Sequence, residues 1–270
     1  MHIVQSGISA SIATLERELD TPLFRRSKHH VELTEAGRAL LAGARRALAA
    51  VAEAHAAVRY TSGPLTGTLR IGVIQAIPPR LRLSSLLRDF HLAYPGVYLD
   101  VYRLATPLFD ELRSGQVDIA IGPGHAPEGI VSIPLGRYPF ALAVRESDPL
   151  AKRSSVTIEH TADLPQIAAP RSWVSRNLVD RCFADAGFTR RIVAESNDFV
   201  LMLGMVASGV GVAIVPDTVA RFGPSVRFVP FKPSIGEWSA ALLYMGPEPT
   251  KPAARALLDM FTSRREQYAP

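Results

Sequence analysis

Cysteine is nearly absent from this chain of 270 residues, and a single cysteine excludes both an intrachain disulfide and a cysteine-rich metal site. Cys182 stands among Leu178, Val179 and Phe183, so we expect it to be a small buried hydrophobic side chain. The histidines are scattered, and none has metal-ligand spacing to another His, Cys or acid. Neither a phosphate-binding glycine loop nor a nucleophile elbow is present. We therefore predict no metal, no cofactor and no catalytic residues.

Export signals and membrane-spanning runs are also missing from the sequence. The longest uncharged run, Phe199 to Pro216, is divided by Ser208, Gly209 and Gly211 into a helix-like and a strand-like half. No charged segment followed by an apolar core opens the chain, so the expected location is the cytoplasm. A hydrophobic content of 47% is enough for two or more packed domains. A net charge of +5 permits a polyanionic partner without demonstrating one.

The stretch from Thr34 to Thr61 is nearly free of loop-forming residues and predicts a long helix, with Thr34 as its cap and Gly63-Pro64 at its end. One seam of this helix carries Leu40, Ala44, Ala47, Val51, Ala54 and Val58. A core helix of a single domain is one interpretation, although such helices are usually bulkier along the buried stripe. We favour a connector that pairs with a copy of itself, because small residues allow close approach.

The segment before this helix combines a short amphipathic helix with a basic hairpin. Ile8, Ile12 and Leu15 mark the buried side of the helix, and its other side is small and polar enough to enter a DNA major groove. The stretch from Phe24 to His30 contains no acid and precedes a short alternating segment, which predicts a wing. Taken alone, a solvated turn is the alternative. The residues expected to face DNA are Gln5, Ser6, Ser9, Ala10, Thr14, Arg25, Arg26 and Lys28.

In these motifs the sequence resembles the LysR-type transcriptional regulators. The matching positions are Gln5 to Ser9, Ile12, Leu15-Glu16, Leu23-Phe24, Arg26 and Leu33 to Gly37, then Gly67 to Gly72 and Ala253 to Leu258. The resemblance implies a winged helix-turn-helix, a dimerising linker helix and an α/β, two-lobed, periplasmic-binding-protein-like sensor of a small-molecule effector. The expected domains are 1–33, 34–62 and 67–270, with lobe 1 at about 67–140 and 246–270 and lobe 2 at about 141–245.

The sequence departs from the family pattern at its start. About two helices precede the recognition helix in the family, whereas Met1 stands almost directly before it here. We therefore expect a partial reader, with Ile8 and Leu15 exposed to water. Two interpretations stay open: a start assigned too late, or a dimeric effector sensor without DNA binding. Asp20 replaces a frequent glycine, which is tolerable because aspartate adopts left-handed geometry more easily than most residues.

Beyond a hinge at Gly63 to Gly67, strand-like and helix-like segments alternate, which predicts a mostly parallel sheet with helices on both faces. The expected strands are 68–73, 98–103, 117–121, 140–144, 167–169, 192–195 and 210–215, and the expected helices are 81–90, 108–114, 175–186, 199–207 and 252–262. We expect the chain to cross between lobes near Tyr138 to Ala141 and near Met245 to Pro249. A solute-binding protein is a rival with the same fold, but it leaves residues 1–60 unexplained.

Ligands of such sheets bind beyond the carboxyl ends of the strands, where helix N-termini present amide donors. The effector contacts expected from this rule are Gln75, Ala76, Ile77, Thr106, Gly122, Arg171, Ser172, Trp173, Asn197 and Phe199. Arg171 is the expected carboxylate clamp, and Trp173 and Phe199 are the expected apolar walls. Purely structural roles stay open, with Thr106 and Asn197 as helix caps and Trp173 closing the rim of its lobe.

The residues before the first helix of lobe 1 also bear on the effector. Pro78-Pro79 remove amide donors there, so this helix start is a weak anion site. We therefore predict an apolar or aromatic effector, with a single carboxylate as an option. The expected mechanism is allosteric: effector binding changes lobe closure, and the linker helices transmit the change to paired readers in a dimer or tetramer.

Overall fold

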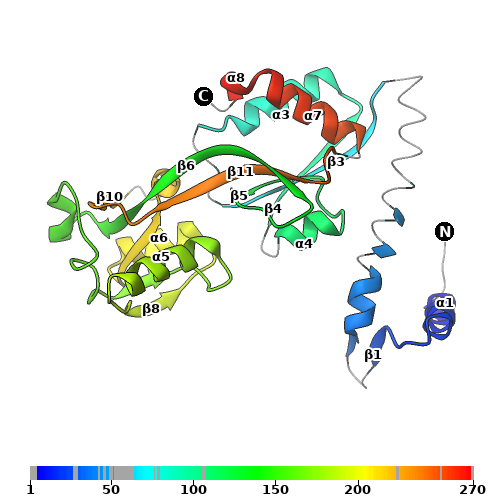
Figure 1. The fold of residues 1–270 in the computed structure, drawn as a ribbon, viewed down its shortest axis with the longest axis horizontal. Helices are drawn as coiled ribbons and strands as arrows, with labels where there is room; N and C mark the ends of the chain where they lie inside the picture. Colours follow the sequence, from blue (N-terminus) through cyan, green and yellow to red (C-terminus); the bar gives the residue numbers. More distant parts are fainter. Residues whose placement is uncertain are drawn as a thin grey trace.

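The computed structural model describes residues 5–26, 30–41, 43–44, 47–48, 51, 64–75, 77, 80–104, 108–222, 225–249 and 251–268. A small winged region at the N-terminus is followed by a helical segment and then by a two-lobed α/β domain (Figure 1). The winged region consists of α1 (Gln5–Glu18) and an antiparallel hairpin of β1 (Phe24–Arg26) and β2 (Val31–Leu33). Helix, hairpin and second helix thus follow one another in the predicted order.

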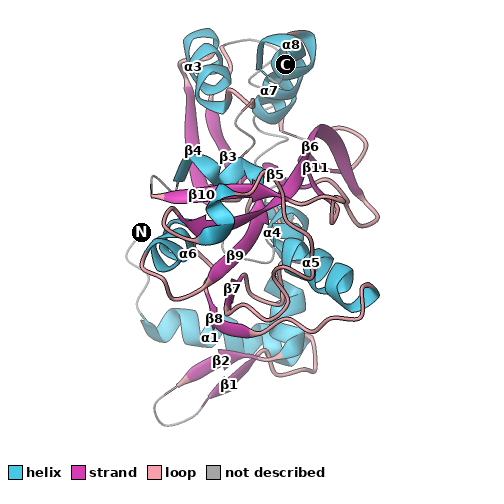
Figure 2. Cartoon of the chain, turned by 90° about the vertical axis from the view of Figure 1, so that its left-hand side faces the viewer, coloured by secondary structure: helices cyan, strands magenta, loops and turns pink. Residues whose placement is uncertain are grey.

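Hydrogen bonds join the hairpin of the winged region, at the bottom of Figure 2, to α1 and to the helix that follows the hairpin. Glu16 Oε1 accepts hydrogen bonds from the amides of Leu23 at 2.7 Å and Phe24 at 3.1 Å. Thr34 caps the following helix, because its Oγ1 accepts the amide hydrogen of Gly37 at 2.9 Å, and this confirms the predicted cap. Asp20 has a φ of 48°, the left-handed geometry that its position required.

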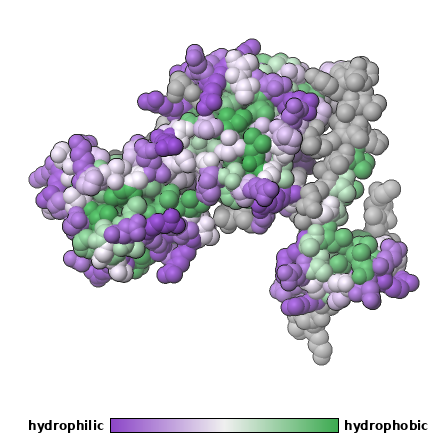
Figure 3. Space-filling model, viewed as in Figure 1, coloured by the Kyte–Doolittle hydropathy of each residue, from purple (hydrophilic) through white to green (hydrophobic). Residues whose placement is uncertain are grey.

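Apolar side chains of α1 are exposed in this chain. Ile8 and Leu15 are 49% and 38% exposed, and Figure 3 shows hydrophobic surface over the winged region at the lower right. The helical residues 35–41, 43–44, 47–48 and 51 continue this pattern, since Leu48 and Val51 are 71% and 57% exposed. That exposure does not fit a core helix of one domain. The seam positions Ala54 and Val58 lie outside the described residues.

The first lobe has helices on both faces of its sheet, as predicted (Figure 1). Its central strand β3 (Gly67–Val73) pairs in parallel with β4 (Val97–Arg103) and β5 (Ile119–Pro123). Helices α3 (Leu83–Ala93), α7 (Pro252–Ser263) and α8 (Arg265–Tyr268) cover one face. Helix α4 (Leu108–Arg113) covers the other. Ile119 and Ile121 of β5 point to the first face and Ala120 to the second, the alternation expected for a strand buried on both sides.

The second lobe is built on a mixed sheet with a single apolar core. Strand β9 (Val212–Pro216) pairs with β7 (Gln166–Ala168), which pairs with β8 (Ile192–Glu195). The long strand β6 (Ile130–Arg145) pairs with both β9 and β10 (Val226–Pro230). Helices α5 (Val174–Asp185) and α6 (Phe199–Ala207) bury Phe183 and Met202 in this core. The short 3-10 helices are η1 (Pro149–Lys152) and η2 (Asp217–Phe222).

Two long strands, β6 (Ile130–Arg145) and β11 (Glu237–Met245), carry the chain between the lobes. Residues 130–139 of β6 pair with β11, whereas residues 140–145 pair with β9 and β10. The first crossing therefore lies in β6 at the expected place. The return differs from the expectation near Met245 to Pro249, because β11 already pairs with β5 from Ala240 to Leu243.

Local sequence features explain why neither strand was fully predicted. Pro134, Gly136 and Pro139 interrupt the alternating pattern of β6, so only residues 140–144 were expected as a strand. The structure accommodates the interruption with a register shift opposite Ala240 and Ala241. Bulges of this kind tolerate proline and glycine within a ladder. Hydrogen bonding to β11 thus overrides the local preference.

Candidate functional site

A cavity of about 260 Å³ lies between the lobes, beyond the carboxyl ends of their strands. From the first lobe it is lined by Ile74, Gln75, Leu104, Leu108, Phe109 and Pro123. From the second lobe and the crossing strand it is lined by Ser172, Trp173, Val174, Ser175, Phe199, Pro216 and Trp238. Each lobe thus contributes about half of the residues that line the cavity.

The predicted effector contacts divide into those that line this cavity and those that do not. Gln75, Ser172, Trp173 and Phe199 line it, whereas Ile77, Gly122, Arg171 and Asn197 do not. Ala76 and Thr106 lie outside the described residues. Gly122 faces the core of lobe 1, where an added Cβ would lie 2.8 Å from Leu108 Cδ1. Arg171 is exposed beside the cavity, so the predicted clamp does not reach into it in this structure.

Several lining residues were not anticipated from the sequence. Leu104 directly follows β4, where the strand-end rule points, but its apolar side chain gave no separate signal. Pro123, at the end of β5, belongs to the loop Gly122-Pro123-Gly124 that this rule selects. Trp238 is different, because it lies on β11, which the sequence pattern did not predict. Its ring packs against Tyr138 of β6, with centroids 6.2 Å apart. The crossing strands therefore supply a wall of the site.

The cavity is largely apolar and contains a few polar groups. The Trp173 and Phe199 rings meet edge to face, with centroids 5.3 Å apart. Ser172 and Ser175 flank the start of α5, whose N-cap residue makes no side-chain capping hydrogen bond. The amides of a first helical turn lack intrahelical acceptors and carry the positive end of the helix dipole. Among the described residues, no lysine or arginine lines the cavity.

Beside the cavity, side chains from the first lobe reach the start of α6 in the second. Gln75 Nε2 donates to the carbonyl oxygen of Asn197 at 2.6 Å, and the amide of Phe199 donates to Gln75 Oε1 at 2.8 Å. Arg103 Nη1 donates to Asp198 Oδ2 at 3.1 Å. The pKa of Asp198 is lowered, chiefly because its carboxylate also accepts the amide hydrogen of Leu201, and Arg103 adds to the shift against the effect of desolvation.

The expected DNA-facing side chains that the structure describes lie on an exposed surface. Ser9, Ala10 and Thr14 of α1 and Arg25 of β1 are all exposed. Arg25 stands opposite Glu32 in the hairpin register. The side chains of Gln5, Ser6, Arg26 and Lys28 are outside the described part of the chain. The surface geometry is that of a helix beside a basic wing.

The described residues contain neither a metal-binding cluster nor a membrane-spanning helix. No group of three or more His, Cys, Asp or Glu side chains there is placed to hold a metal ion. No helix in the same part of the chain is long and apolar enough to cross a membrane.

A winged DNA-reading element joined to a two-lobed ligand-binding domain defines a class of one-component regulators, and comparison with known proteins identifies the family. Residues 1–38 match the family model described as "Bacterial regulatory helix-turn-helix protein, lysR family". Residues 62–266 match the model described as "LysR substrate binding domain". The chain belongs to the LysR family of DNA-binding transcriptional regulators, which confirms the resemblance seen in the sequence.

Individual relatives agree with this assignment. The chain is 33% identical over 226 residues to the transcriptional regulator ShiR of Corynebacterium glutamicum, covering 82% of this chain and 76% of that protein. A full-length OxyR variant from Pseudomonas aeruginosa has a TM-score of 0.72 and 25% identity, covering 98% of this chain and 86% of that one. CbnR, solved in complex with its target DNA, has a TM-score of 0.67 and 21% identity, covering 99% of this chain and 91% of that one. ShiR is described as an HTH-type transcriptional regulator and CbnR as a LysR family transcriptional regulator.

Proposed function

We propose that the cavity between the lobes is the effector site of this regulator, and that its effector is a small, largely apolar or aromatic molecule with one carboxylate. The lining carries the proposal: Trp173, Phe199 and Trp238 offer aromatic surface, and no cationic side chain among the described residues faces them. The first-turn amides of α5, beside Ser172 and Ser175, are suited to a single carboxylate. Effector binding would change lobe closure and thereby the spacing of paired readers.

The effector proposal is tested by fluorescence and calorimetry, because the two tryptophans of the chain both line the cavity. We expect phenylacetate to bind with a change in tryptophan emission, its neutral analogue phenylacetamide to bind more weakly, and succinate not to bind. The aromatic ring would fill the apolar walls, and the carboxylate would interact with the start of α5. Binding of succinate and other fully polar acids alone would contradict the proposal.

We further propose that α1 and the wing bind DNA and that the protein works in the cytoplasm as a dimer or tetramer. The linker helices of two copies would pair along their exposed seam. Ser9, Ala10 and Thr14, with Gln5 and Ser6, would approach base edges. Arg25, Arg26 and Lys28 would hold phosphates. The exposed positions Leu48 and Val51 support self-association, because paired linker helices would cover them.

The wing makes a separate prediction about salt. Replacing Arg25 by alanine should weaken binding to all DNA sequences and reduce the slope of log affinity against log salt concentration by about one unit. The measurement is fluorescence anisotropy with DNA from upstream of the gene, across a salt series. Arg255→Ala in α7 is the control and should leave the slope unchanged. An unchanged slope for Arg25→Ala would remove that side chain from the DNA interface.

A further inference from the structure

We propose that Gln75, Arg103 and Asp198 form an interlobe clasp that sets how far the free protein is closed. Gln75 follows β3 and Arg103 ends β4, both in the first lobe, whereas Asp198 is the N-cap of α6 in the second. Three hydrogen bonds described above join the first lobe to the start of α6, and each of them involves at least one of these side chains. They are positioning residues, because they act on the effector through closure of the cavity.

The contacts of the clasp join residues that no local structure holds together. The bonded pairs are separated by 95 to 124 positions along the chain. The lobes are also connected by the crossing strands β6 and β11 and by Ile74 of the first lobe, which packs against the core of the second. An interlobe hinge of this kind can rotate without unfolding either lobe. The three hydrogen bonds exist only while the lobes stay together. Closure in the free chain is therefore stabilised by its own side chains and not by an effector alone.

The clasp has a neutral part and a charged part. Gln75 uses both ends of its amide, and neither bond depends on charge. The Arg103 and Asp198 side chains are 56% and 34% exposed, so salt should screen their attraction. Salt should therefore loosen the clasp only in part.

The clasp also bears on the class of effector, and this step rests on the proposed function. Gln75 Oε1 and Asp198 Oδ1 already accept the first-turn amides of Phe199 and Leu201. An effector carboxylate consequently has no free donor at these two amides of α6. The start of α5 also lies at the cavity, and its N-cap residue makes no side-chain capping hydrogen bond. The clasp thus favours α5 over α6 as the partner of a carboxylate.

The test measures cavity opening in the full chain without ligand or DNA. Acrylamide quenching of Trp173 and Trp238 reports exposure of the cavity, and small-angle scattering reports the radius of gyration. Gln75→Ala, Arg103→Gln and Asp198→Asn should each raise the quenching constant, since each hydrogen bond lost shifts the open-to-closed ratio by about five-fold. Gln75→Ala loses two such bonds and should have the largest effect. Asparagine keeps the capping acceptor of α6, so Asp198→Asn removes the ion pair without removing the cap.

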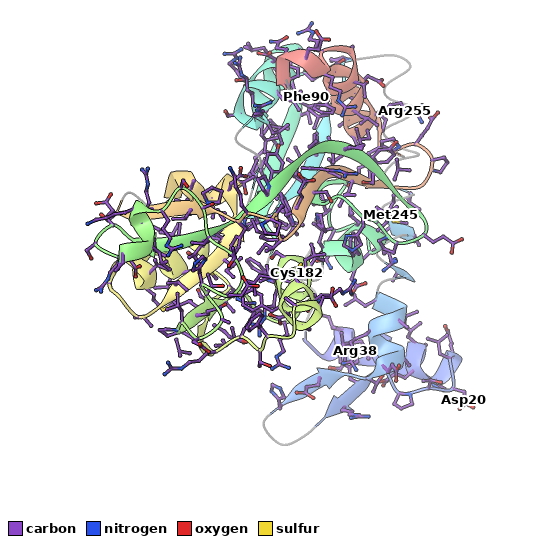
Figure 4. All side chains as sticks on the ribbon, turned by 60° about the vertical axis from the view of Figure 1, so that its left-hand side comes forward. Asp20, Arg38, Phe90, Cys182, Met245 and Arg255 are labelled. Carbon is purple, nitrogen blue, oxygen red and sulfur yellow. The ribbon has the colours of Figure 1, made fainter. Side chains whose placement is uncertain are left out.

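Coupling between the variants separates a clasp from a general loss of structure. Arg103→Gln and Asp198→Asn combined should open the cavity no further than either alone, because both remove one ion pair. Added salt should raise quenching in the wild type and have little effect in Arg103→Gln. Arg255→Ala is the matched control: its ion pair with Glu248 is 2.7 Å long, its side chain is 55% exposed, and Figure 4 shows it in the first lobe, away from Cys182 in the second. Arg255→Ala should change neither the quenching constant nor the radius of gyration.

Unchanged quenching and radius of gyration in folded Gln75→Ala and Arg103→Gln would overturn the clasp, as would an equal response in Arg255→Ala. These outcomes are independent of the effector class. Opening in the clasp variants without phenylacetate binding by the wild type would support the clasp and count against the proposed effector. Phenylacetate binding by the wild type with no opening in the variants would do the reverse.

Discussion

Replacing Gly37 by alanine is expected to lower specific DNA affinity about 100-fold while the two-lobed domain stays folded. A Cβ at this position would lie 2.1 Å from the carbonyl oxygen of Leu23 and 2.9 Å from Leu33 Cδ2. The first contact is with backbone, which cannot rotate away as a side chain can. The same Leu23 oxygen accepts the amide hydrogen of Thr34, and the Gly37 amide donates to Thr34 Oγ1. The clash therefore displaces the hairpin from the helix that carries it.

The measurement for Gly37→Ala is fluorescence anisotropy with operator DNA, and Gly204→Ala is its matched control. Gly204 is also helical, in α6, but beyond its chain neighbours and its own helix backbone no atom lies within 4 Å of a Cβ built there. That substitution should raise helix stability by about 1 kcal/mol and leave DNA affinity unchanged. Tryptophan quenching in Gly37→Ala should equal that of the wild type, because both tryptophans line a cavity of the other domain. Full DNA affinity in Gly37→Ala would show that the junction is not needed for reading DNA.

The sequence predicted most of the fold because many elements carry their own boundary signals. Helix α6 has the predicted bounds, since Asp198 caps its start and Ser208 follows its last residue. Strands β6 and β11 had no such signals: prolines and a glycine interrupt the first half of β6, and β11 is fixed by pairing with β5 and β6. Non-local pairing of this kind leaves little trace in a local pattern.

The candidate site was predictable to the extent that strand ends define it. The rule that ligands bind beyond the carboxyl ends of strands located Gln75, Trp173 and Phe199, which line the cavity. It could not locate Trp238, which lies on the crossing strand itself. Nor could it foresee that Gln75 would bond to the start of α6, because that contact depends on how far the lobes close. The local sequence determines which loops lie at the strand ends, whereas the angle between the lobes determines which residues of the other lobe these loops contact.

Arg190→Ala should lower the free energy of unfolding of the second lobe by about 3 kcal/mol, for reasons that only the folded structure shows. The Arg190 side chain is 5% exposed, bonds to Gln166 Oε1 at 2.8 Å and pairs with Asp180. Its guanidinium also lies 5.6 Å from the centre of the Phe183 ring. Burial lowers the pKa of Arg190 below its ordinary value, and Asp180 opposes the shift. Truncation would leave the oxygen of the buried Gln166 without this donor and a void beside Phe183.

Thermal and urea denaturation followed by circular dichroism would measure the loss, with an expected fall in melting temperature of roughly 6–12 °C. Arg191→Ala is the control, because the Arg191 side chain is exposed. Its hydrogen bond with the Gln166 amide is made by the backbone oxygen, which the substitution keeps. Asp180 binds both Arg190 and Arg176. Because Arg190→Ala and Asp180→Ala both break the Arg190–Asp180 pair, the double variant should lose less unfolding free energy than the sum of the two single variants. Equal melting temperatures for Arg190→Ala and Arg191→Ala would mean that the buried network contributes nothing net, because desolvation of the guanidinium then offsets its bonds.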